Sequence, residues 1–132
     1  MIRNSLLAIT SLLLTMSLST AETYSLADAK NLSLMHSGWK STQSGKSVAG
    51  RPLTLGGKVF KEGLGTHAPG SGLILLDGKA ENFTATVGLD SSANGMVEFI
   101  VKADKKVVWK SGLLKRDDAA KEINIPLTGV KE

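Results

Sequence analysis

The sequence has no cysteine, and it has few prolines, few aromatic residues and only a mild excess of positive charge. Because cysteine is absent, the chain of 132 residues cannot carry a disulfide scaffold, a thiolate zinc site or a cysteine nucleophile. Its 16 Lys and Arg exceed its 12 Asp and Glu by a formal net charge of +4. Proteins that bind nucleic acid concentrate more positive charge on one face, so the balance argues against that class. The length fits one domain.

The first 21 residues have the composition of an export signal. Arg3 precedes a run from Leu6 to Leu18 that is apolar apart from Thr and Ser, and small residues end the segment at Ala21. This pattern predicts a signal peptide over residues 1–21, cleaved after Ala21. Residues 22–132 are then a secreted or periplasmic domain with no membrane attachment. A membrane anchor is the less favoured alternative, because a spanning helix needs about 20 predominantly apolar residues.

The sequence of the mature chain predicts mainly short strands. Residues 82–88 alternate apolar and polar side chains with a period of two, which is typical of a half-buried strand. Further strands are predicted at residues 73–76, 96–102, 106–109 and 123–127. Turn-forming residues separate these strands, at 77–78, 91–95, 103–105 and 111–112.

Helical signal is thin in the same part of the chain. Residues 25–30 predict one helical turn with Ser25 as N-cap, and the polar segment 115–121 predicts a loop. Pro126 cannot donate a hydrogen bond to a sheet, so the last strand is expected at an edge or to end there. The sequence therefore predicts an all-β sandwich.

Two short motifs resemble nucleotide sites, and each lacks a part that its chemistry needs. Residues 63–68 match G-x-G-x-x-A, but Pro69 and the glycines after it prevent the helix that would hold a pyrophosphate. Residues 44–47 have the ending of a phosphate-binding loop, but Lys40 stands where its first glycine is required. Neither motif predicts a nucleotide cofactor.

The segment 90–95 begins like a calcium-binding loop. The bidentate glutamate that such a loop needs would lie at position 101, which is Val101. A looser calcium site through Asp90 stays open, and a tight turn between two strands is favoured over it. The sequence therefore indicates no cofactor.

Catalytic residues are not recognisable in the sequence. His36 and His67 have no carboxylate or thiol beside them, and nothing resembles a nucleophile elbow. Asp117 and Asp118 are adjacent carboxylates, but the charged residues around them are typical of a solvated loop. The chain is predicted not to be an enzyme.

Several groups of residues, spread over the whole mature chain, occur in the order of one known family. They are Tyr24–Asp28, Gly38-Trp39, Gly50–Gly57, Phe60–Ala68 with Leu73 and Leu76 after it, Phe83–Asp90, Gly95–Val101, Val108–Ser111 and Ile123–Gly129. In these residues the chain resembles the NPCBM family of carbohydrate-binding modules that accompany glycoside hydrolases. The resemblance implies a galactose-binding-like jelly-roll β-sandwich.

The same resemblance implies a function. It suggests an exported, non-catalytic module whose partner is carbohydrate, with galactose-containing glycans as the expected ligands. An alternative is the N-terminal fragment of a secreted glycoside hydrolase, similar to an alpha-galactosidase, whose catalytic domain lies beyond residue 132. A third possibility is a protein-binding adhesion domain on the same sandwich, since a fold does not fix a function.

The chain departs from the family pattern at its end. After Leu127-Thr-Gly129 the family continues with another apolar strand and an acidic, glycine-rich stretch, whereas this sequence ends at Glu132. The resemblance therefore implies that the last strand or strands are absent. A missing strand would leave an unpaired sheet edge, and we expect poor stability for such a domain in isolation.

Sugars are bound by stacking on an aromatic ring and by hydrogen bonds to their hydroxyl groups. The candidate residues are Trp39, His67 and Trp109, with Asp90 and Arg51 as polar partners. Trp109 ends a predicted strand, so the alternative to a binding role is that its ring packs in the core. The alternative for His67 is a structural role, in which a ring nitrogen forms a hydrogen bond with a backbone carbonyl. Of the three aromatic candidates, Trp39 is the one most expected to be exposed.

Overall fold

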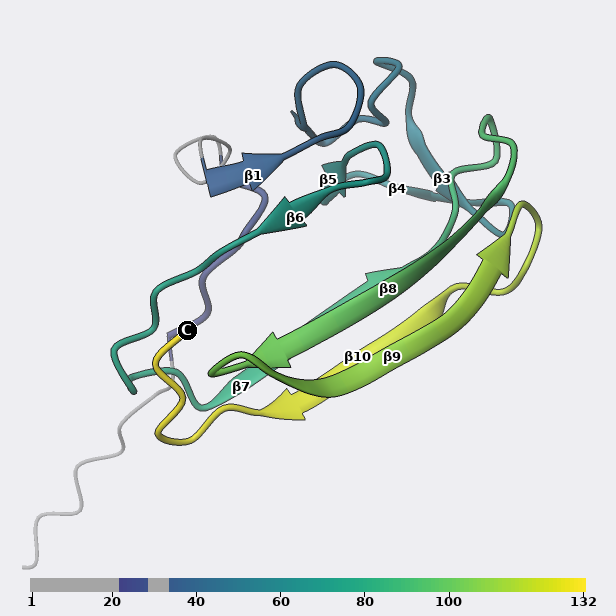
Figure 1. Ribbon diagram of the computed structural model, residues 1–132. Helices are drawn as coiled ribbons and strands as arrows, with labels where there is room; N and C mark the ends of the chain where they lie inside the picture. The colour runs from purple at the N-terminus through teal and green to yellow at the C-terminus, as the bar shows by residue number, and fades with distance from the viewer. Residues whose placement is uncertain (1–21, 29–33) are drawn as a thin grey trace, which may run out of the picture.

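The structure is a computed structural model, and it describes residues 22–28 and 34–132. It contains the strands β1 (Met35–His36), β2 (Gln43–Ser44), β3 (Leu53–Leu55), β4 (Lys58–Phe60), β5 (Leu64–Gly65), β6 (Ser71–Gly72), β7 (Asn82–Val87), β8 (Met96–Ala103), β9 (Lys106–Lys115) and β10 (Lys121–Pro126). Figure 1 shows the long strands β7 to β10 together, with the short strands β1 to β6 gathered above them. Within the described residues, no helix has the length and apolar character to span a membrane.

The strands pair antiparallel, two by two, in the order β1–β6, β2–β5, β3–β4, β7–β10 and β8–β9. The first three pairs are nested, because β3–β4 lies between β2 and β5 in the chain, and these lie between β1 and β6. Nesting folds the chain between Met35 and Gly72 back on itself. The loop that joins β1 to β2 therefore lies against the loop that joins β5 to β6.

The core forms where the two long strand pairs meet. Ile123, Ile125 and Leu127 are buried, and the inward side chains of β7 pack on them. Val101 of β8 and Trp109 of β9 pack against the same cluster, and these two residues are cross-strand partners. The inward positions of β7, β8 and β10 follow the period of two that a half-buried strand requires.

Most of the predicted long strands are confirmed. Residues 82–87 form β7, residues 96–103 form β8, and β10 ends at Pro126 as its missing N–H requires. The predicted turn at 77–78 is present, with positive φ at both residues. The all-β prediction is thus confirmed for the described part of the chain.

Two predictions are wrong. Residues 73–76 do not form a strand, because Leu73 and Leu75 are 55% and 72% exposed and the segment has no ladder partner among the described residues. The turn predicted at 111–112 is a β-bulge inside β9, where the register shifts opposite Phe99. Gly112 supplies the positive φ of 71° that lets the strand continue to Lys115, so β9 is longer than the predicted strand at 106–109.

The six short strands of the first half were not predicted. Each has only two or three residues, which is too short to display a period of two. The predicted helical turn at 25–30 extends beyond the described residues. Its first part is a turn in which the N–H of Ala27 donates to Ser25 Oγ at 3.2 Å.

Candidate functional site

The nested strand pairs bring Trp39 and His67 together. His36 pairs with Ser71, and Gln43 pairs with Gly65, so the segments 37–42 and 66–70 run between the same two pairs of strands. Trp39 lies on the first segment and His67 on the second. The two rings are 28 positions apart in the sequence, and their centroids lie 5.7 Å apart with an interplanar angle of 68°.

A small network of hydrogen bonds holds the two segments in this arrangement. The N–H of Gly38 donates to the carbonyl of His67 at 2.9 Å, and the N–H of His67 donates to Ser37 Oγ at 3.0 Å. The hydroxyl of Ser37 in turn donates to the carbonyl of Trp39 at 2.9 Å. Because every link involves backbone, the segments are fixed independently of the Trp39 side chain.

Trp39 offers an aromatic surface to solvent. The residue is 50% exposed, so part of the indole is accessible to a ligand. The ammonium of Lys40 lies 4.5 Å from the indole centroid, within the range of a cation–π contact. The ring of His67 packs against the indole in an edge-to-face arrangement, which is a favoured geometry for two aromatic rings.

The hydrogen bond of His67 assigns its ring nitrogens. Nδ1 lies 2.6 Å from the carbonyl oxygen of Ala68, and a carbonyl can only accept, so Nδ1 carries the proton. In the neutral ring Nε2 is then the acceptor. The predicted bond to a backbone carbonyl is therefore present, and it leaves the other nitrogen to accept a hydrogen bond from a hydroxyl group beside Trp39.

Trp109 has a different environment. It lies on the inward face of β9, opposite Val101, and packs against the buried cluster that includes Ile123. The structure therefore places Trp109 in the core and does not group it with Trp39 and His67. Its role in binding stays a prediction from the sequence.

Asp90 and Arg51 lie near one another, and Asp90 organises the turn after β7. One carboxylate oxygen of Asp90 accepts the N–H of Thr54 at 3.0 Å, and the other accepts the N–H of Ser92 at 2.9 Å. Partial burial favours the neutral acid, but the hydrogen bonds from Ser92 and Thr54, with the charge of Arg51, lower the pKa of Asp90 below its usual value.

These contacts account for Asp90 as a turn residue. Both oxygens of its carboxylate accept protein N–H groups, which agrees with the favoured interpretation of the segment 90–95 as a tight turn. Within residues 22–28 and 34–132, no three His, Asp or Glu side chains are grouped so that they could hold a metal ion. The binding roles predicted for Asp90 and Arg51 stay predictions.

Replacing Asp90 with Asn is expected to lower the free energy of unfolding by about 1 kcal/mol at pH 7, because the amide nitrogen cannot accept an N–H. The pKa of Asp90 is lowered by folding, so its contribution is complete above the usual value of 3.8 and is lost as the pH falls through the lower, folded value. Urea unfolding of both proteins between pH 7 and pH 3 measures this. A difference that grows as the pH falls would contradict it.

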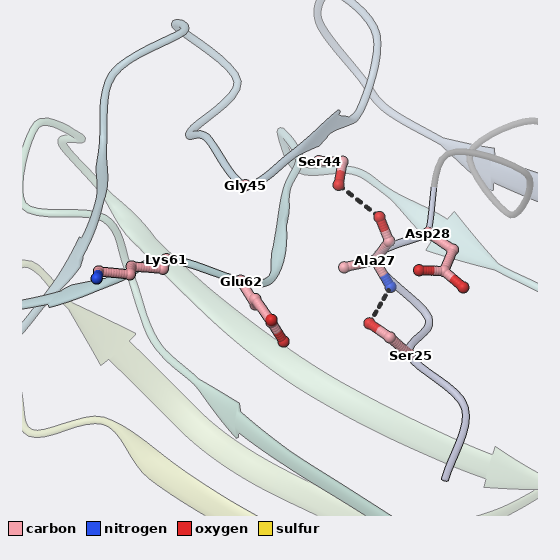
Figure 2. A pocket seen from close by; sticks show the side chains of 7 residues that line it. All are labelled: Ser25, Ala27, Asp28, Ser44, Gly45, Lys61 and Glu62. Carbon is pink, nitrogen blue, oxygen red and sulfur yellow. Dashed lines mark hydrogen bonds between the residues drawn. The ribbon is translucent and has the colours of Figure 1, made fainter.

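A pocket of about 190 Å³ lies at residues other than Trp39 and His67, and Figure 2 shows the side chains that line it. It is lined by Ser25, Ala27, Asp28, Ser44, Gly45, Lys61 and Glu62. The hydroxyl of Ser44 donates to the carbonyl of Ala27 across it, which ties the N-terminal segment to β2. The pocket has no aromatic ring on which a sugar can stack, so we place the candidate site at Trp39 and His67.

Sequence reasoning found Trp39 and His67 but missed two of their neighbours, Ser37 and Lys40. Lys40 follows Trp39 directly, yet consecutive residues do not in general face one another; here Lys40 has a positive φ of 55° and its ammonium lies over the indole. Ser37 is a small polar loop residue, and nothing in the sequence distinguishes it from the serines around it.

Comparison with known proteins identifies one family and several relatives. The sequence profile of the NPCBM/NEW2 domain matches residues 22–132. A Renibacterium salmoninarum protein named "Putative endo-alpha-N-acetylgalactosaminidase" is 32% identical over 85% of this chain and 8% of its own length. Alpha-1,3-galactosidase B of Akkermansia muciniphila is 35% identical over 65% of this chain and 11% of its own length. The chain thus spans about a tenth of the length of these relatives.

A solved structure shares the fold. CBM51 from Clostridium perfringens GH95, determined in complex with methyl-galactose, superposes with a TM-score of 0.73 and 24% sequence identity. The match covers 82% of this chain and 81% of that one. The agreement at this level of identity shows that the described strands form the same fold as that module.

Proposed function

The chain belongs to the NPCBM/NEW2 domain family, and from this premise we propose that it is a non-catalytic carbohydrate-binding module for galactose-containing glycans. The observation that carries the proposal is the half-exposed indole of Trp39 beside the ring of His67. An apolar face of a pyranose stacks on such an indole, and Nε2 of His67 accepts a hydrogen bond from a sugar hydroxyl.

The relatives support the choice of galactose. One is named a galactosidase, another an N-acetylgalactosaminidase, and one of the modules that share the fold was determined with methyl-galactose. The two named enzymes act on the same class of sugar, although the chain spans only a small part of each. Their common chemistry favours a galactose-type ligand for this chain.

We also propose that the module works outside the cytoplasm and beside a catalytic domain. The predicted signal peptide at residues 1–21, which lies outside the described residues, and its cleavage after Ala21 support export. The small fraction of each relative that the chain covers supports a longer parent protein, such as a glycoside hydrolase. The reading frame beyond Glu132 tests the idea of a longer parent protein.

Affinity electrophoresis through a gel that contains a galactosylated polysaccharide tests the proposed function. We expect the full chain to be retarded, and free galactose to restore its mobility where glucose does not. A dissociation constant near 1 mM corresponds to about 4 kcal/mol, which one stacked ring and a few hydrogen bonds can supply. Absence of retention on every galactosylated glycan would contradict the proposal, and a partner protein bound without competition from galactose would favour an adhesion domain.

A further inference from the structure

The net positive charge of the domain lies in the half of the chain that carries Trp39 and His67. Residues 22–76 contain six Lys and Arg and three Asp and Glu. Residues 77–132 contain nine Lys and Arg and nine Asp and Glu, so that half is balanced. An anionic ligand is therefore attracted to the first half of the domain more than to the second.

Within this half, Lys40 is a cation that contacts the candidate site. Its ammonium lies 4.5 Å from the Trp39 centroid, and among the described residues it pairs with no carboxylate. Arg51 differs, because its charge acts on Asp90. Lys58 lies 5.2 Å from the ring of Phe60, on β4, which is not part of the segments 37–42 and 66–70.

The position of Lys40 affects any sugar that uses Trp39. A sugar that approaches the indole face covered by the ammonium must displace it, and a neutral sugar offers nothing in return for the lost cation–π contact. A sugar with an anionic group gives the displaced ammonium a new partner. The lysine stem is flexible, so the ammonium can swing around the edge of the indole to reach that group.

We propose that the site at Trp39 and His67 prefers galactosides that carry an anionic substituent, either a sulfate or a carboxylate, and that Lys40 is the residue that selects them. The proposal rests on the proposed function, because it names the ligand class of the same site. Both substituents place negatively charged oxygen atoms near the stacked ring, and the ammonium of Lys40 binds such oxygen atoms.

Isothermal titration of the full chain with methyl galactoside, its 6-sulfate and methyl galacturonoside tests the proposal. We expect at least one anionic sugar to bind roughly fivefold more tightly than the neutral one, as one exposed ion pair allows. Raising the salt from about 50 mM to about 500 mM is expected to remove most of this preference, because salt screens exposed charges. The sulfate and carboxylate arms distinguish the two sources of charge.

Matched variants separate Lys40 from the general charge of this half of the domain. Lys40→Ala is expected to abolish the preference while binding of the neutral sugar is kept or strengthened, and Lys40→Arg is expected to retain it. Lys58→Ala is the control, since it removes an equal charge that also lies over an aromatic ring in the same half. The control is expected to keep at least half of the preference.

The outcomes distinguish this inference from the proposed function. Equal binding of the neutral and anionic sugars would overturn the inference and leave the proposed function in place. An equal loss in Lys40→Ala and Lys58→Ala would overturn the role of Lys40. Failure of all three sugars to bind, with a normal thermal transition, would overturn the proposed function itself.

Discussion

Replacing Trp39 with alanine is expected to weaken galactoside binding by at least about 30-fold without changing the stability of the domain. A ligand held in a small site depends on its aromatic anchor, and truncating such an anchor costs about 2 kcal/mol or more of binding free energy. The fold does not depend on this side chain, because the indole is 50% exposed and the adjoining hydrogen bonds are made by backbone and Ser37. Titration calorimetry and thermal unfolding of the full chain measure the two effects.

Trp109→Ala is the comparison for this prediction, and it is expected to behave in the opposite way. Trp109 packs against the buried cluster of β10, so its truncation leaves a cavity and lowers the free energy of unfolding by about 3 kcal/mol. Below the lowered melting temperature, the remaining folded protein is expected to bind sugar. If Trp39→Ala retains wild-type affinity, or if it melts as early as Trp109→Ala, the candidate site is wrongly placed.

The long strands could be predicted because their side chains alternate over six or more residues. Strand β7 shows this directly, with Phe83, Ala85 and Val87 turned inward and the threonines between them turned outward. Strand β9 was predicted too short because Gly112 was interpreted as a turn. A glycine with positive φ is equally compatible with a bulge, and only the pairing with β8 decides between the two.

The site could be predicted only in part, because its residues meet through long-range pairing. Trp39 and His67 were each recognised as residue types that bind sugars, but nothing local in the sequence indicates that they are in contact. Their contact depends on the nested pairs β1–β6 and β2–β5, each of which has only two residues per strand. Trp109 had an equal claim from its residue type, and only the register of β9 assigns its ring to the core.

The nested pairing also identifies the glycine on which the site depends most. Gly65 is buried in β5 next to β2, and a Cβ atom at this position would lie 2.1 Å from the carbonyl oxygen of Lys46 and 2.6 Å from Ser47 Cα. These atoms belong to the backbone that follows β2, so they can only move if this segment separates from β5. His67 follows Gly65 by two residues, and a displacement of β5 moves its ring away from Trp39.

Gly65→Ala is therefore expected to destabilise the domain and to impair the site together. Overpacking against backbone costs about 3 kcal/mol or more, which lowers the melting temperature of a domain of this size by more than about 10 °C. Gly88→Ala is the control, because the added Cβ would make only an ordinary contact with the side chain of Leu55 at 3.4 Å. Calorimetric melting and galactoside titration of both variants measure the effects. A Gly65→Ala protein that melts with the wild type would show that β2 and β5 are not packed as described, and the contact between Trp39 and His67 would then lose its structural basis.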